Sequence, residues 1–180
     1  KLRQICCDPR LHYEDYKAGS AKLDTCMELV RGALNGGHRI LLFSQFTGML
    51  DIIGKRLAKE DIAFLKLTGA SSKESRAKMV AQFQAGEVPV FLISLKAGGV
   101  GLNLTAADVV IHYDPWWNVA AQDQATDRAH RIGQQHTVTV YKLIAKDTIE
   151  ERIMQMQESK RDLVNSVLGG DGISSALFTR

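Results

Sequence analysis

Two arginines stand three residues apart in the stretch QATDRAHRIGQ, residues 124–134. If this stretch is a helix capped by Asn118 and ended by Gly133, Arg128 and Arg131 share one face. Adjacent guanidinium groups repel each other, so they suit a site where a polyanion lies between them and each planar fork binds phosphate oxygens. The alternative is a surface ion pair between Asp127 and Arg131, worth about 0.3 to 0.5 kcal/mol, and taken alone the stretch slightly favours it.

A glycine-rich segment changes that balance. The stretch SLKAGGVGLNL, residues 94–104, directly follows an apolar run, and its glycines let backbone N–H groups approach an anion. It is not a dinucleotide fingerprint, because that pattern needs glycine where Leu104 stands. A plain tight turn is the structural alternative. Together, the two stretches favour phosphate chemistry.

The chain does not carry a complete phosphate-transfer site. Around Lys55, the sequence Gly-Lys-Arg lacks the Ser or Thr and the first glycine of a phosphate-binding loop. No Asp-Glu pair follows an apolar strand to hold magnesium, and the five histidines have no metal-ligand spacing. Cys6, Cys7 and Cys26 are too irregularly spaced for a disulfide framework, so we expect reduced thiols and an intracellular protein.

Composition bounds the class of protein. The chain has 180 residues, of which 45% are hydrophobic and 24% are charged, as expected of one globular domain. Its apolar runs are too short to span a bilayer, and disorder is excluded by its aliphatic content. A net charge of +3 permits contact with a polyanion without requiring it. Because the chain opens at Lys1 with no export leader, we expect a piece of a longer protein.

Apolar runs alternate with helical patterns along the chain. Strands are predicted at 39–44, 62–67, 89–94, 108–113 and 137–144. Helices are predicted behind Ser20, over 47–59, behind a Ser71–Glu74 capping box and ending at Gly86, and behind a Thr148–Glu151 capping box. This alternation predicts an α/β domain with a doubly wound parallel sheet, helices on both faces and ligands at the carboxyl ends of the strands.

Four stretches, in this order, resemble the second RecA-like lobe of the Swi/Snf family of ATP-dependent DNA translocases. They are FSQFT with MLD (43–51), TGASS with Arg76, AGGVGLNLTAADVVIHYDPWWN (97–118) and QATDRAHRIGQ. With LRQIC and Asp8-Pro9 at the start, the resemblance covers almost the whole chain. It implies a single RecA-like domain over 21–147, a leading segment or linker over 1–20 and a bracing helix and tail over 148–180.

The resemblance also implies half of an ATPase site. Arg128 and Arg131 would be arginine fingers that reach ATP held by a preceding N-terminal RecA-like lobe, which would also hold Mg²⁺. Gln124 would orient their helix. Gly99, Gly101 and Asn103 would lie near the nucleotide. The isolated chain is therefore expected to be an inactive monomer that forms part of a DNA-dependent ATPase.

Double-stranded DNA is the second implied partner. The resemblance implies that the protein contacts the DNA phosphates and does not separate the strands. The implied contact residues are Ser44, Gln45, Ser71, Ser72, Lys73, Lys96, Ala97, Gly98 and Trp117. A protein–DNA complex would be the target of remodelling, in the bacterial cytoplasm and nucleoid or in a eukaryotic nucleus. Two alternatives stay open: a catalytically silent nucleic-acid-binding or regulatory module, and a lobe of a strand-separating helicase.

Overall fold

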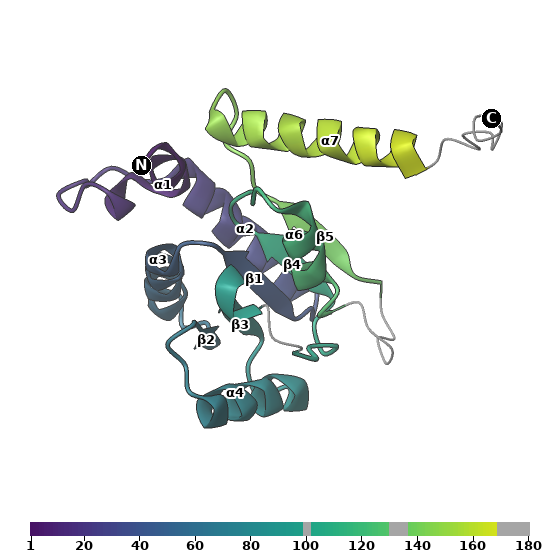
Figure 1. Cartoon of the computed structure of the whole chain (residues 1–180). Helices are drawn as coiled ribbons and strands as arrows, with labels where there is room; N and C mark the ends of the chain where they lie inside the picture. Colours follow the sequence, from purple (N-terminus) through teal and green to yellow (C-terminus); the bar gives the residue numbers. More distant parts are fainter. Residues whose placement is uncertain (99–101, 130–136, 169–180) are drawn as a thin grey trace, which may run out of the picture.

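The computed structural model describes residues 1–98, 102–129 and 137–168. Its centre is a parallel sheet of β1 (Ile40–Ser44), β2 (Phe64–Leu67), β3 (Val90–Ser94), β4 (Val109–His112) and β5 (Thr139–Lys142), in the order β2-β3-β1-β4-β5 (Figure 1). The predicted parallel sheet is confirmed, and every strand lies within its predicted range.

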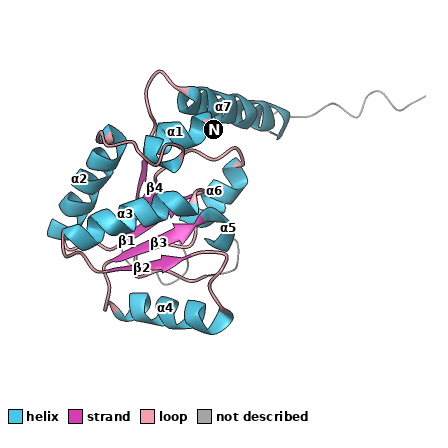
Figure 2. Cartoon of the chain, turned by 90° about the vertical axis from the view of Figure 1, so that its left-hand side faces the viewer, coloured by secondary structure: helices cyan, strands magenta, loops and turns pink. Residues whose placement is uncertain are grey.

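Helices connect the strands and cover the sheet on both faces (Figures 1 and 2). They are α1 (Leu2–Cys7), α2 (Ala21–Asn35), α3 (Thr47–Lys59), α4 (Lys73–Ala85), α5 (Leu95–Gly98), α6 (Val119–Thr126) and α7 (Ile149–Leu168), with a 3₁₀ turn η1 at Pro9–Leu11. The sequence predicted α3 at its observed limits. It did not predict α1, because six residues are too few to display a helical period.

Alternate residues of the central strands separate the core into two layers. Ile40 and Leu42 of β1 pack with α2 and α3, whereas Leu41 and Phe43 pack with α4, α5 and α6. Side chains of β1 are buried along the whole strand, as they are along β3 and β4. Burial on both faces explains why these strands read as continuous apolar runs in the sequence.

Two of the predicted helix signals have the expected geometry. Ser20 Oγ accepts a hydrogen bond from Leu23 N at 3.3 Å and caps α2. Gly86 ends α4 with φ at 85°, a left-handed conformation that favours glycine. The predicted cap at Ser71 is wrong by one residue: Ser72 caps α4 by accepting from Ser75 N at 3.1 Å. Ser71 Oγ instead accepts from Thr68 N.

The helix predicted to carry both arginines is shorter than expected. The helix α6 ends at Thr126. In the turn that follows, Arg128 N donates to Ala125 O and Ala129 N donates to Thr126 O, so each bond joins residues three positions apart as in a 3₁₀ turn. Arg128 therefore lies beyond the helix, and the prediction of one continuous helix to Gly133 is wrong for residues 127–129. Arg131 and Gly133 lie outside the described residues.

The edge strand β5 differs from the central strands in burial. Its four residues are all exposed, because it has a neighbour on only one side among the described residues. Whether a strand is buried therefore depends on its position in the sheet as well as on its sequence. Within the described residues, no helix is both long and apolar enough to cross a membrane.

The first and last helices of the described chain contact each other at one end of the sheet. In both views α1 lies beside α7, and their contact joins the segment before α2 to the helix that follows β5 (Figures 1 and 2). Lys22 at the start of α2 donates to Glu150 at the start of α7 at 2.6 Å, and both side chains are almost fully buried. The domain limits at 20/21 and 147/148 stay a prediction.

Candidate nucleic-acid and nucleotide interface

Four segments that are far apart in the sequence follow the carboxyl ends of neighbouring strands. Ser71, Ser72 and Lys73 follow β2, Lys96 to Gly98 follow β3, Ser44 and Gln45 end β1, and Trp117 follows β4. Because parallel strands end at the same edge, the fold places the predicted DNA-contact residues along that edge. This is the strand-end edge of the sheet.

These residues differ in exposure, and Gln45 and Ser71 are intermediate. Ser72, Lys73, Lys96 and Trp117 are exposed, and Trp117 is the most exposed tryptophan with 43% of its surface accessible. Ala97 is buried, and its carbonyl accepts from Arg76 Nη1 at 3.5 Å. The exposed hydroxyl and ammonium groups are suited to contact with phosphate oxygens, which need no particular base sequence.

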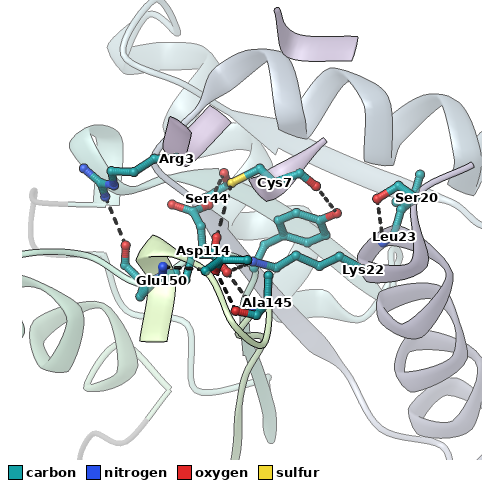
Figure 3. Close-up of polar contacts among 12 residues, drawn as sticks. Arg3, Cys7, Ser20, Lys22, Leu23, Ser44, Asp114, Ala145 and Glu150 are labelled. Carbon is teal, nitrogen blue, oxygen red and sulfur yellow. Dashed lines mark hydrogen bonds and ion pairs between the residues drawn. The ribbon is translucent and has the colours of Figure 1, made fainter. Parts of the chain in front are cut away.

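Ser44 and Gln45 are committed to contacts within the fold. Ser44 is fully buried, and its hydroxyl donates to Asp114 Oδ1 at 2.5 Å (Figure 3). The backbone and side-chain N–H groups of Gln45 both donate to Asp114 Oδ2. Burial of Asp114 raises the pKa of its carboxyl group, while the hydrogen bonds from Ser44 and Gln45 oppose that rise. A contact between the Ser44 hydroxyl and DNA would require this network to open.

The loop that carries Trp117 is held by side chains from several elements. The carbonyl of Pro115 accepts from Arg3 of α1 at 3.1 Å and from Gln45 at 3.2 Å. The N–H of Trp116 donates to Gln122 of α6, and its carbonyl accepts from Gln157 of α7. We call residues 114–117 the tryptophan loop. Its backbone is fixed, while the Trp117 indole stays exposed.

The predicted nucleotide-contact residues lie on the two segments that flank β4. Asn103 is exposed, and the next residue, Leu104, donates its N–H to the carbonyl of Arg128 at 3.1 Å. Gln124 is exposed on α6. The Arg128 side chain is only 1% exposed. Gly99, Gly101 and Arg131 lie outside the described residues.

Sequence reasoning did not identify Asp114, Arg3, Gln122 or Gln157 as parts of this edge. Their roles depend on long-range contacts, since Asp114 meets residues 69 and 70 positions away. Only the position of Asp114 at the end of an apolar strand could have signalled it.

Thiol and metal chemistry are not indicated. Cys6, Cys7 and Cys26 are free, and burial raises the pKa of Cys7 and raises that of Cys26 to about 12. These two thiols are therefore held in their unreactive form. Over the ranges 1–98, 102–129 and 137–168, no three His, Cys, Asp or Glu side chains could hold a metal ion together.

Comparison with known proteins identifies a family. Residues 21–133 match the model of the helicase conserved C-terminal domain. The chain is 45% identical over 172 residues to an uncharacterized ATP-dependent helicase of Mycoplasma pneumoniae, a match that covers 95% of this chain and 17% of the relative. It is 47% identical over 156 residues to the chromatin-remodeling ATPase INO80 of Cryptococcus neoformans. This match covers 86% of this chain and 9% of that protein. The chain thus spans less than a fifth of these relatives.

A solved structure agrees with these matches. The SWI2/SNF2 ATPase C-terminal domain of Sulfolobus solfataricus superposes with a TM-score of 0.74 at 35% sequence identity. The match covers 92% of this chain and 68% of that domain. The predicted RecA-like fold is confirmed by this likeness.

Proposed function

The chain belongs to the helicase conserved C-terminal domain family and, within it, to the SWI2/SNF2 type, and from this we propose that it is the second motor lobe of an ATP-dependent translocase on double-stranded DNA. The observation that carries the proposal is the strand-end edge, where exposed hydroxyl and ammonium groups from separate strands come together. A preceding lobe, which would supply the phosphate-binding loop, completes the motor.

DNA would lie along the strand-end edge. Lys73 and Lys96 would neutralise phosphates, and the Ser72 hydroxyl would donate to a phosphate oxygen. Gln45, Ser71 and the backbone of Ala97 and Gly98 border the same edge and would add contacts that do not depend on base sequence. The exposed indole of Trp117 offers a flat apolar surface to the duplex. Remodelling of a protein–DNA complex would follow from movement along the duplex.

ATP would be shared between this lobe and the preceding one. Asn103 and Gln124 expose amide groups that can donate to ribose or phosphate oxygens, which fits contact with one side of a nucleotide. Arg128 and Arg131 would supply positive charge to the transferring phosphoryl group, with Gly99 and Gly101 near the nucleotide. The burial of Arg128 adds a condition, since its guanidinium would have to move out to reach ATP. Mg²⁺ would be held by acidic residues of the preceding lobe.

The burial of Arg128 also favours a second candidate, a silent module that binds nucleic acid without supporting hydrolysis. The two candidates differ in the two-lobe parent protein. The motor predicts DNA-stimulated ATP hydrolysis that depends on Arg128 and Arg131, whereas the silent module predicts none. A strand-displacement assay of the same protein separates a duplex translocase from a strand-separating helicase.

The DNA surface is tested by titrating a duplex into this chain at several salt concentrations. We expect the double variant Lys73→Gln, Lys96→Gln to bind more weakly and to reduce the salt slope by about 1 to 2, because each phosphate contact releases counterions. The charge-matched control is Lys55→Gln, Lys59→Gln, whose lysines are exposed on α3, away from the residues that follow the strand ends. Equal effects of the two double variants would contradict a DNA surface at the strand-end edge.

A further inference from the structure

Arg3 of α1 contacts the tryptophan loop both at its backbone and at one of its rings. Its Nη2 donates to Gln45 Oε1 at 2.5 Å and to the carbonyl of Pro115 at 3.1 Å. Its guanidinium carbon also lies 5.7 Å from the centre of the Trp117 ring and 6.0 Å from that of Phe46. One side chain thus contacts the backbone of the loop and the ring that the loop presents.

These contacts suit the shape of arginine. A planar guanidinium can donate in its plane to two acceptors while its face covers an aromatic ring. A lysine ammonium carries the same charge, yet it has no flat face and no fixed arrangement of donors. The Gln45 amide completes the arrangement, because it accepts from Arg3 and donates to Asp114.

Among the residues that the structure describes, the neighbours of Trp117 in the loop are held differently from its indole. Its neighbours Pro115 and Trp116 are held through their backbone groups by Gln45, Gln122 and Gln157. The Trp117 indole itself is 43% exposed, and its one described ring contact is with the Arg3 guanidinium. The Arg3 guanidinium is therefore the described group placed to orient the indole.

From this geometry, we infer that Arg3 is a positioning residue for Trp117, which sets the orientation of the indole at the strand-end edge. Because Arg3 belongs to α1, a shift of α1 relative to the sheet is transmitted to the indole. Its consequence for DNA rests on the proposed function, in which Trp117 contacts the duplex. The orientation itself does not rest on that proposal.

Tryptophan fluorescence tests the inference directly, because both tryptophans of the chain, Trp116 and Trp117, lie in this loop. In a Trp116→Phe background, the emission comes from Trp117 alone. We expect Arg3→Lys to raise quenching by acrylamide about twofold, since the indole loses the guanidinium that lies 5.7 Å from its ring centre. Arg3→Gln, which also removes the charge, is expected to do the same. The control is Arg31→Lys on α2, whose guanidinium pairs with Glu60, the C-cap residue of α3.

Thermal melting of each sample separates positioning from folding. We expect the Arg3 variants to melt within about 4 °C of the Trp116→Phe variant that carries Arg3, because Arg3 is partly exposed and its loss costs little stability. Increased quenching with such a melting temperature supports the inference. Unchanged quenching in both Arg3 variants, or an equal increase in Arg31→Lys, would overturn it.

A duplex DNA titration is the second arm, and it tests the proposed function separately. Trp117→Ala serves as the reference, with an expected loss of affinity of about tenfold, and Arg3→Lys is expected to lose about threefold. If Trp117→Ala binds DNA like the unaltered chain, the DNA contact of this residue is wrong, while the quenching result still decides the role of Arg3.

Discussion

The hydroxyl of Ser44 at the end of β1 donates to the carboxylate of Asp114, just beyond β4, at 2.5 Å. The bond joins two neighbouring strands where their backbone pairing ends. Gln45 adds two donors to the same carboxylate. Asp114 therefore fixes the relative position of two segments of the strand-end edge.

Asp114→Ala is expected to lower the free energy of unfolding by about 2 to 4 kcal/mol, because it leaves the donors of Ser44 and Gln45 without their acceptor inside the fold. Urea unfolding measures the loss. Asp51→Ala is the control, since Asp51 is exposed in an ion pair with Lys66 and its removal should cost less than about 1 kcal/mol. Similar losses for the two variants would show that the hydrogen bonds to Asp114 contribute little to stability.

His112 is expected to make stability depend on pH. Burial lowers the pKa of its imidazole to about 4, while in the unfolded chain it returns to 6.5. Between these values the unfolded chain binds a proton that the folded chain does not, so the free energy of unfolding falls as pH falls from 6.5 to 4, by about 3 kcal/mol in all.

The measurement for His112 is urea unfolding at a series of pH values. In His112→Gln this part of the pH dependence should disappear. The difference between the two profiles then gives the contribution of His112, since the carboxylates contribute equally to both. Parallel profiles for the unaltered chain and the variant would show that folding does not shift the pKa of this imidazole.

Gly86→Ala is expected to cost about 1 to 3 kcal/mol of stability. Its φ is 85°, and an added Cβ would stand 1.8 Å from Arg39 Nη2, which belongs to the guanidinium that donates to the carbonyl of Phe83 at the end of α4. Gly37→Ala is the matched control, because its φ is also positive but an added Cβ meets nothing within 4 Å. Thermal melting of the two variants measures the loss of stability. An equal loss would show that the cost comes from the positive φ of the backbone and not from the clash with Arg39.

Arg131→Lys in the two-lobe parent protein is expected to reduce ATP turnover by roughly 10²-fold or more, since lysine cannot offer a planar fork to two phosphate oxygens. Melting temperature and DNA affinity should barely change. The surface ion-pair alternative with Asp127 predicts normal activity instead. A steady-state rate within about threefold of the unaltered protein, or roughly 0.65 kcal/mol, would remove Arg131 from the catalytic residues.

The isolated chain should show no DNA-stimulated ATP hydrolysis, because in the proposed function the groups that catalyse phosphoryl transfer are divided between two lobes. Phosphate release by the purified chain with saturating duplex DNA measures this. Turnover above background would contradict the half-site. Addition of the preceding lobe on the same polypeptide should restore hydrolysis.

The sequence predicted those parts of the fold that depend on local pattern. The buried strands β1, β3 and β4 and the helix α3 appear where apolar spacing indicated them. The exact cap of α4 was not predictable, since Ser71 and Ser72 are adjacent and chemically equal. The exposure of β5 was not predictable either, because it depends on the position of the strand in the sheet.

For the candidate site, the sequence predicted that the residues follow strand ends, but it did not predict which side chains contact one another. The parallel direction of the strands places Lys73, Lys96 and Trp117 at one edge, while their contact with DNA stays a prediction. The burial of Ser44 was not foreseen, because its partner Asp114 lies 70 residues away in the sequence. Side-chain partners at that separation leave no periodic signal in a single sequence.

The buried pair of Lys22 and Glu150 has a consequence for how the protein is made. These residues are 128 positions apart, so a ribosome working at about 5 to 20 residues per second completes Glu150 roughly 6 to 25 s after Lys22. Until then, the Lys22 ammonium cannot be buried without a large desolvation penalty. The start of α2 therefore remains hydrated on the nascent chain, and the final closure of the lobe waits for α7 to leave the exit tunnel.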